Sequence, residues 1–302
     1  MTDLSILKTQ VWKSDAAVLR AKGADALDFL HRLSTQDLRG ALGDDAKSVS
    51  TAFTTAQGKL VEWCRIYRVS AEEFLLVCHG SRGEQLREWI EKYIIIEEVE
   101  VSDVSNEFLT LECGVEAPDS ELLEGTEVLR VSTPPGAMLR YEVLYPSSGP
   151  NLAGVEGLVS GNAESRELLR LIAGQPSPHL EYQKDTNPLE LNLLHDAIGW
   201  NKGCYIGQEV ISRMDSYDKV ARGIIGFEST SAAELPAPGD KLVSVEGKTV
   251  GRVTSSATTS EGTCIGLALV GRQWSSGSEV KVLASSGEIQ VRLVERSFGR
   301  KP

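Results

Sequence analysis

The chain has 302 residues and a formal net charge of −12, with 41% hydrophobic and 25% charged residues. This length fits two domains, and the composition is that of an ordinary globular protein. A surface this negative repels phosphate backbones, so we expect no nucleic-acid binding. The apolar runs are far shorter than a membrane span and the first residues lack a transit-peptide pattern, so we expect a cytoplasmic protein without membrane contact.

The five cysteines are scattered, and no two of them have a CxxC spacing. Because their number is also odd, we expect neither a disulfide framework nor a cysteine-rich zinc site. The four histidines are dispersed too, and His195 fits a structural role better than a ligand role. We therefore predict no metal site.

Hydrophobic periodicity predicts mixed helices and strands in the first 222 residues. An apolar face of Ala26, Leu27, Leu30 and Leu33 indicates a helix that begins after Gly23. Further helices are expected at 82–93, 163–173, 189–197 and 207–215. Strands are expected at 16–20, 48–55, 59–69, 74–78, 98–104, 108–112, 127–131 and 141–145. The Pro-, Gly- and Ser-rich residues 116–161 predict strands joined by irregular loops.

The pattern changes after Gly223, where helical periodicity vanishes. Short β-rich runs separated by Gly, Ser and Pro turns predict a small β-barrel or sandwich. The six runs lie at 224–228, 241–245, 249–257, 264–270, 279–284 and 290–295. We place the domain boundary here, which gives domains at 1–222 and 223–302.

The segment with the most chemical content surrounds Cys204. Gly203 and Gly207 lie on either side of it and allow an unusual backbone path. Lys202 and the start of the helix expected at 207–215 both favour a thiolate at Cys204. The alternative is a small apolar residue that fills a tight turn.

The run K-G-C-Y-I-G-Q-E at residues 202–209 resembles, without a gap, the signature of the YgfZ family. Members of that family are folate-binding relatives of the glycine cleavage T-protein, tied to iron–sulfur cluster assembly or repair. Further segments resemble elements of the same superfamily, at residues 20–38, 52–63, 168–176, 187–194, 251–257 and 265–270. The resemblance covers nearly the whole chain and fades only from about residue 113 to 160.

The resemblance implies an α+β fold in which two intertwined mixed α/β subdomains form a folate-binding core, covered on one side by an antiparallel C-terminal β-barrel. It implies an accessory protein that depends on tetrahydrofolate, a reduced folate. Its partners would be iron–sulfur assembly proteins or client iron–sulfur enzymes. Cys204 would be its working thiol. The other motif positions are Lys202, Gly203, Tyr205, Gly207, Gln208, Glu209 and Arg213.

Two features of the T-protein are missing from this sequence. Its adjacent acidic residues, one of them catalytic, match a stretch at 57–63 that keeps a single acid, Glu62. Its Y-T-G-E-D-G-F-E loop has no counterpart in residues 145–157. Both losses argue against ordinary aminomethyl transfer. A folate-dependent aminomethyltransferase or demethylase-type enzyme, with Glu62 as acid or base, is the alternative function, and a binding module without chemistry is a third.

The predicted folate contacts are Glu62, Glu190 and Trp200. Glu190 would accept a hydrogen bond from the pterin amino group; alternatively, it complements the dipole at a helix N-terminus. Trp200 would stack on the pterin, as could Trp63 and Trp89, although large aromatic residues more often belong to a core.

Two expectations concern charged side chains of the motif. Lys202 would contact an anion such as the folate glutamate tail or a partner; the alternative is a solvated lysine on a turn. Glu209 and Arg213 are spaced i,i+4, which predicts an ion pair on a helix surface.

Overall fold

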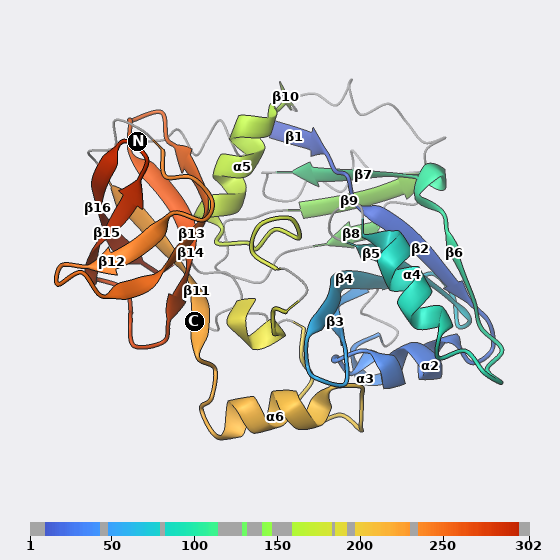
Figure 1. Ribbon diagram of the computed structural model, residues 1–302. Helices are drawn as coiled ribbons and strands as arrows, with labels where there is room; N and C mark the ends of the chain where they lie inside the picture. The colour runs from blue at the N-terminus through green and yellow to red at the C-terminus, as the bar shows by residue number, and fades with distance from the viewer. Residues whose placement is uncertain are drawn as a thin grey trace.

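The computed structural model describes residues 10–42, 48–78, 82–113, 129–131, 141–146, 159–182, 185–191, 197–229 and 235–295. Within these ranges the chain forms two five-stranded sheets and a closed barrel, with helices packed between and around them (Figure 1). His195 lies outside the described residues, as does most of the Pro- and Gly-rich stretch. None of the helices in the described part is long and apolar enough to cross a membrane.

The first sheet is antiparallel and has the strand order β3-β4-β5-β2-β6. Its strands are β2 (Ala17–Lys22), β3 (Ser48–Thr54), β4 (Leu60–Arg68), β5 (Glu73–Cys78) and β6 (Glu100–Asp103). The helices packed on it are α2 (Ala26–Leu33), α3 (Leu38–Ala41) and α4 (Gly83–Glu91). Phe29 and Leu30 of α2 and Leu86 and Ile90 of α4 are buried in one core with the strands, as their helical spacing predicts.

The second sheet has the order β10-β1-β7-β9-β8. Its strands are β1 (Gln10–Lys13), β7 (Phe108–Cys113), β8 (Leu129–Val131), β9 (Tyr141–Pro146) and β10 (Val159–Ser160), and a 3-10 turn at Ser105–Glu107 precedes β7. The strand β1 comes before the whole first sheet in the chain, whereas β7 to β10 follow it. The two sheets are therefore intertwined, as the resemblance implied.

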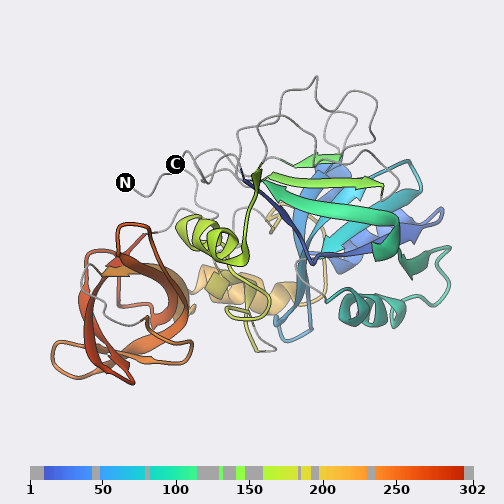
Figure 2. The ribbon, with the colours of Figure 1, turned by 90° about the horizontal axis from the view of Figure 1, so that it is seen from above.

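The helix α5 (Ala163–Ile172) connects the sheets to the barrel. The Asn162 side chain caps its start by accepting a hydrogen bond from the Ser165 amide at 2.8 Å. Trp12 of β1 donates through Nε1 to the Asn162 carbonyl at 3.0 Å. Leu171 packs in a core with Leu267 of the barrel, and α5 lies between barrel and sheets (Figure 2).

The C-terminal part is a closed six-stranded antiparallel barrel with the order β11-β14-β13-β12-β15-β16. Its strands are β11 (Arg222–Ser229), β12 (Lys241–Ser244), β13 (Thr249–Thr258), β14 (Cys264–Gly271), β15 (Glu279–Ala284) and β16 (Gly287–Val294). Closure decides between the two architectures considered and leaves no sheet edge unpaired. The α+β prediction is thereby confirmed, while the boundary between residues 222 and 223 stays a prediction.

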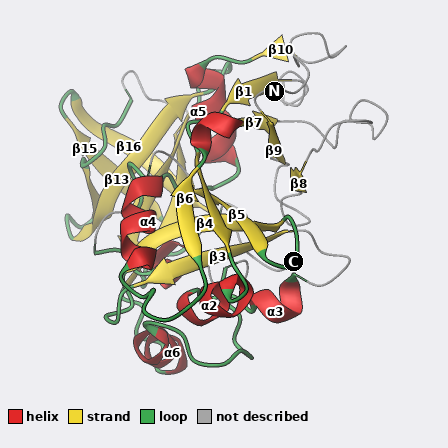
Figure 3. Ribbon diagram, turned by 90° about the vertical axis from the view of Figure 1, so that its right-hand side faces the viewer, coloured by secondary structure: helices red, strands yellow, loops and turns green. Residues whose placement is uncertain are grey.

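The segment between α5 and the barrel is described only in part. A 3-10 turn covers Pro188–Leu191, and residues 192–196 lie outside the described chain, so the helix expected over 189–197 stays a prediction. Asn187 accounts for the short turn, because its side-chain oxygen accepts a hydrogen bond from the Leu189 amide at 2.9 Å. The helix α6 (Gln208–Ser216) follows and lies below the first sheet in the view of Figure 3.

Candidate functional site

The K-G-C-Y-I-G-Q-E loop packs against the turn that follows β3. Gly207, the residue before α6, has a φ of +86°, and a Cβ there would lie 2.5 Å from the Thr55 carbonyl oxygen. The Thr54 hydroxyl donates to the Ile206 carbonyl at 2.6 Å. A left-handed backbone conformation in such a narrow space admits only glycine, so the second motif glycine fixes the contact between loop and turn.

Cys204 lies in the exposed part of this loop. Among the four cysteines whose side chains are described, Cys204 is exposed, and Cys64, Cys78 and Cys264 are buried. A side chain built on the neighbouring Gly203 would meet nothing within 4 Å. A reagent or partner can therefore reach the thiol from solvent.

Lys202 turns inward, toward the end of α2. Its Nζ donates to the carbonyl oxygens of His31 at 2.5 Å, Ser34 at 2.6 Å and Gln36 at 2.9 Å. Burial lowers the pKa of Lys202 to about 8, against the opposite influence of Asp37. All three ammonium protons are used by the backbone. The arrangement thus differs from both roles considered from the sequence, an anion contact and a solvated side chain.

The remaining motif residues divide into a buried and an exposed group. Tyr205 is buried beside Leu189 and Ile211, and this burial raises its pKa to about 12. The Gln208 amide donates to the Tyr205 carbonyl at 3.2 Å at the start of α6. Glu209 and Arg213 form the expected pair, with 2.5 Å between Oε1 and Nη2, and both side chains are largely exposed.

The predicted folate contacts differ from one another in burial and in their partners. Glu190 is buried and pairs with Arg222 at the start of the barrel, with 3.1 Å between Oε1 and Nε and 3.2 Å between Oε2 and Nη2. Trp200 is 42% exposed. Trp63 is a core residue whose Nε1 donates to Ser50 at 2.7 Å, and Trp89 packs edge-on against Phe53.

Glu62 is a fully buried carboxyl on β4. Its Oε1 accepts hydrogen bonds from the Tyr182 hydroxyl and the Trp63 amide, both at 3.0 Å, and Arg82 Nε lies 3.5 Å from Oε2. Burial raises the pKa of Glu62 to about 8, and Arg82 only partly opposes this. The carboxyl is therefore mostly protonated at neutral pH. General acid–base chemistry requires a group of this kind, which can gain or lose a proton close to neutral pH.

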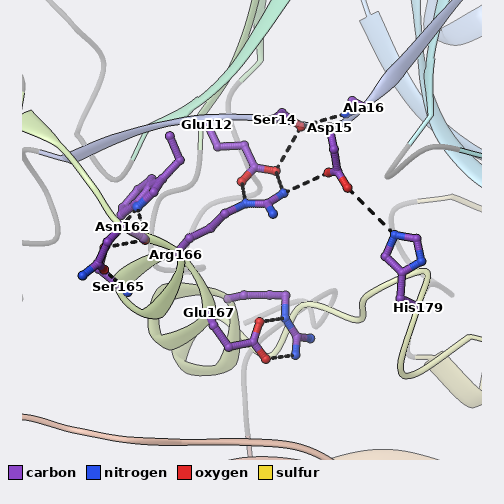
Figure 4. A network of polar contacts seen from close by, with 11 residues as sticks. Ser14, Asp15, Ala16, Glu112, Asn162, Ser165, Arg166, Glu167 and His179 are labelled. Carbon is purple, nitrogen blue, oxygen red and sulfur yellow. Dashed lines mark hydrogen bonds and ion pairs between the residues drawn. The ribbon is translucent and has the colours of Figure 1, made fainter.

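A pocket of about 120 Å³ opens beside α5, between the end of β1 and the chain after the helix. Within it, Arg166 donates two hydrogen bonds to the buried carboxylate of Glu112, of 2.6 Å from Nε and 3.0 Å from Nη2 (Figure 4). Asp15 lies 3.4 Å from Arg166, and His179 lies 3.9 Å from Asp15. Carboxylates, a guanidinium and an imidazole thus face one small space.

Charged groups in the wall of this pocket tie it to the barrel. Arg170 is buried and binds Glu167 through two hydrogen bonds of 2.8 and 2.6 Å, and Glu181 through one of 3.0 Å. Glu181 in turn accepts a hydrogen bond from Ser255 of β13 at 2.6 Å. Such a network holds the pocket wall and the barrel in one arrangement.

The sequence did not single out the pocket residues. Arg166 and Arg170 are one turn apart on a helix with an apolar face. An arginine between the apolar residues of that face, as Arg170 is, was a signal that the sequence offered. Asp15 and Glu112 carry no such signal, because Asp15 lies in the segment after β1 and Glu112 on β7, about 100 residues later. None of Glu62, Glu190 and Trp200 lines this pocket. Among the described residues no group of three or more His, Cys, Asp or Glu side chains could hold a metal ion.

Comparison with known proteins agrees with this architecture. Residues 222–298 match the family described as the glycine cleavage T-protein C-terminal barrel domain. The crystal structure of glycine cleavage system aminomethyltransferase T from Bartonella henselae superimposes with a TM-score of 0.79. The superposition covers 98% of this chain and 89% of that one at 19% sequence identity, so it establishes the fold.

Three curated relatives are similar in sequence. The putative chloroplastic transferase At1g60990 of Arabidopsis thaliana is 25% identical over 264 residues, which are 78% of this chain and 59% of that protein. An aminomethyltransferase of Thermoanaerobacter pseudethanolicus is 24% identical over 324 residues, covering 94% and 84%. The mitochondrial iron–sulfur cluster assembly factor IBA57 of Mus musculus is 28% identical over 242 residues, covering 74% and 66%. The chain thus has the fold of a glycine cleavage aminomethyltransferase, and its residues 222–298 match the C-terminal barrel domain of the glycine cleavage T-protein.

Proposed function

We propose that this chain binds tetrahydrofolate and acts through the Cys204 thiol in the assembly or repair of iron–sulfur proteins. The observation that carries the proposal is an exposed thiol on a loop anchored at both ends. The mouse relative named as an iron–sulfur cluster assembly factor supports the same direction. The partners would be assembly proteins or client iron–sulfur enzymes.

The pocket beside α5 has the chemistry to hold a reduced folate. The aminopyrimidinone edge of a pterin presents N–H groups. A fixed carboxylate such as Glu112 or Asp15 can accept hydrogen bonds from them. Arg166 is paired with Glu112 through two hydrogen bonds, so its part would be to fix the orientation of that carboxylate toward the pterin. When bound, tetrahydrofolate would supply nitrogen atoms that accept a one-carbon unit.

The chain's own contribution is the thiol. A thiolate is the form that attacks a partner or binds a metal. Cys204 lies four residues before α6. The loop therefore presents the thiol at the surface, where a protein partner can meet it.

The decisive experiment compares Cys204→Ser with Asn201→Ser, an exposed neighbour, in cells that lack the native protein. We expect both variants to fold and to bind tetrahydrofolate, and only Cys204→Ser to lose support of iron–sulfur enzyme activity. Full support by Cys204→Ser would end the proposal for the thiol, whatever its alkylation rate.

A second function has one observation in its favour. Glu62 has a pKa near 8, as a group that exchanges protons with a folate-bound substrate would need, and several relatives are named aminomethyltransferases. This enzyme would transfer the carbon of an aminomethyl thioether to tetrahydrofolate, breaking the C–S and C–N bonds and giving methylene-tetrahydrofolate, ammonia and the free thiol, and Glu62→Gln would abolish that turnover. Absence of turnover in the wild-type protein would exclude it.

A further inference from the structure

We infer that Lys202 is a positioning residue, which locks the Cys204 loop onto the C-terminal end of α2 by donating to three backbone carbonyl groups. The inference rests on the proposed function, since it names what holds the acting thiol in place. It assigns Lys202 no contact with folate and no part in the chemistry.

The end of α2 is a natural receptor for an ammonium group. The last carbonyl groups of a helix have no partner within the helix, and the helix dipole makes this end negative. His31 belongs to the last turn of α2, and Ser34 and Gln36 follow it directly. Their three carbonyl oxygens converge on Lys202 Nζ at 2.5 to 2.9 Å. An ammonium has three protons, so the match in number is complete.

The segment that receives Lys202 is itself held firmly. Thr35 accepts a hydrogen bond from the Ala52 amide of β3 at 3.0 Å and donates to the Ala197 carbonyl at 2.5 Å. The Gly199 amide donates to the Thr35 carbonyl at 2.9 Å. The residues just before Lys202 are thus tied to the same segment as its ammonium group. Lys202 closes a ring of contacts between the loop, the end of α2 and the first sheet.

A second anchor lies just beyond the thiol. Tyr205 is buried, and the Ile206 carbonyl is bound by Thr54. Cys204 therefore sits between an inward lysine and an inward tyrosine, with an open glycine position beside it. This alternation explains the motif spacing physically: two anchors three residues apart hold the backbone while the thiol between them stays accessible.

The charged groups around Lys202 fit a structural lysine. Asp37 and Arg39 act on it with opposite sign, and Asp37 also lies 3.4 Å from His31 Nδ1. The ring of Tyr205 lies 5.2 Å from Nζ on the loop side. Because its protons are already donated to carbonyl oxygens, an anionic ligand would have to break the lock to reach them.

The test is hydrogen exchange, followed by mass spectrometry, on peptides covering residues 31–38 and 199–207. Lys202→Met is compared with Lys219→Met, an exposed lysine near the end of α6. We expect Lys202→Met to exchange about tenfold faster in both peptides and to keep its tetrahydrofolate affinity within about twofold. Lys219→Met should match the wild type in both readouts. Unchanged exchange, or a fall in affinity that grows with the number of folate glutamates, would overturn the inference.

Lys202→Arg is a second variant, which keeps the inference testable if Lys202→Met does not fold. The planar guanidinium keeps the charge but cannot direct three protons to one cluster of oxygens. Exchange intermediate between wild type and Lys202→Met supports the lock, and exchange equal to wild type contradicts it. Hydrogen exchange of the Lys202 variants tests the inference about the loop. Iron–sulfur enzyme activity in cells that carry Cys204→Ser tests the proposed function, so the two can fail independently and the failures can be told apart.

Discussion

The Cys204 loop and the pocket beside α5 are built in opposite ways. The loop is a contiguous run of residues 202–207. Its Lys202 side chain donates to backbone carbonyl groups at the end of α2, and its Ile206 carbonyl accepts from the Thr54 hydroxyl at the end of β3. The pocket takes Asp15 from the segment after β1, Glu112 from β7, Arg166 from α5 and His179 from the chain beyond it. Its contacts are ion pairs between side chains far apart in sequence.

The difference explains why one site can be recognised in the sequence and the other cannot. Contacts to backbone carbonyl groups, such as those of Lys202, leave the partner's residue type free. Most of what the loop requires therefore falls on its own residues and is readable as a motif. A pocket of paired side chains spreads the requirement over several elements. Each member then looks like an ordinary surface charge until the fold brings the group together.

The largest expected effect tests the backbone side of this comparison. Gly207→Ala should lower the free energy of unfolding by about 3 kcal/mol, because alanine resists the positive φ and its Cβ would collide with the Thr55 carbonyl. Gly203→Ala is the matched control, and its open surroundings predict a change below about 1 kcal/mol. Urea unfolding measures both. Equal losses would mean that the loop is not held by its contact with the turn.

The same division explains what the sequence could predict of the fold. Apolar alternation located the six barrel strands, because each buries one face in a closed core, as Ile289, Val291 and Leu293 of β16 do. The strand β1 was missed, since four residues that pair with distant β7 and β10 leave too short a pattern. The inward direction of Lys202 was also unreadable, because its partners are carbonyl groups, which every residue has.

The next effect concerns Glu62, which lies outside both regions. Its folded pKa of about 8 is above the unfolded value, so the neutral carboxyl contributes stability below pH 4.5 that is lost as the pH rises through 8. Relative to Glu62→Gln, the wild type should therefore lose on the order of a few kcal/mol between pH 5 and pH 9. Urea unfolding at both pH values measures this difference. The exposed residue Glu209 provides the control: the difference in free energy of unfolding between the wild type and Glu209→Gln should be the same at both pH values. If the difference between the wild type and Glu62→Gln is also the same at both, the Glu62 carboxyl is not protonated in the folded state.

A smaller effect tests the side-chain character of the pocket. Replacing Glu112 and Arg166 together by glutamine removes both charges without leaving one buried and unpaired. We expect tetrahydrofolate affinity, measured by calorimetric titration, to fall at least about tenfold. The exposed pair Glu84 and Arg87, replaced in the same way, should leave the affinity unchanged. Equal affinities in the two double variants would place folate elsewhere.

The smallest expected effect separates the motif residues that hold the loop from those that do not. Glu209 and Arg213 form a largely exposed i,i+4 pair at the start of α6, and such pairs contribute only about 0.2–0.5 kcal/mol. Replacing both by alanine should leave urea unfolding nearly unchanged, and hydrogen exchange of residues 199–207 should equal that of the wild type. If the folded variant nevertheless fails to support iron–sulfur enzymes, the exposed pair contacts a partner. The motif would then combine an inner half that positions Cys204 with an outer half that faces the protein receiving it.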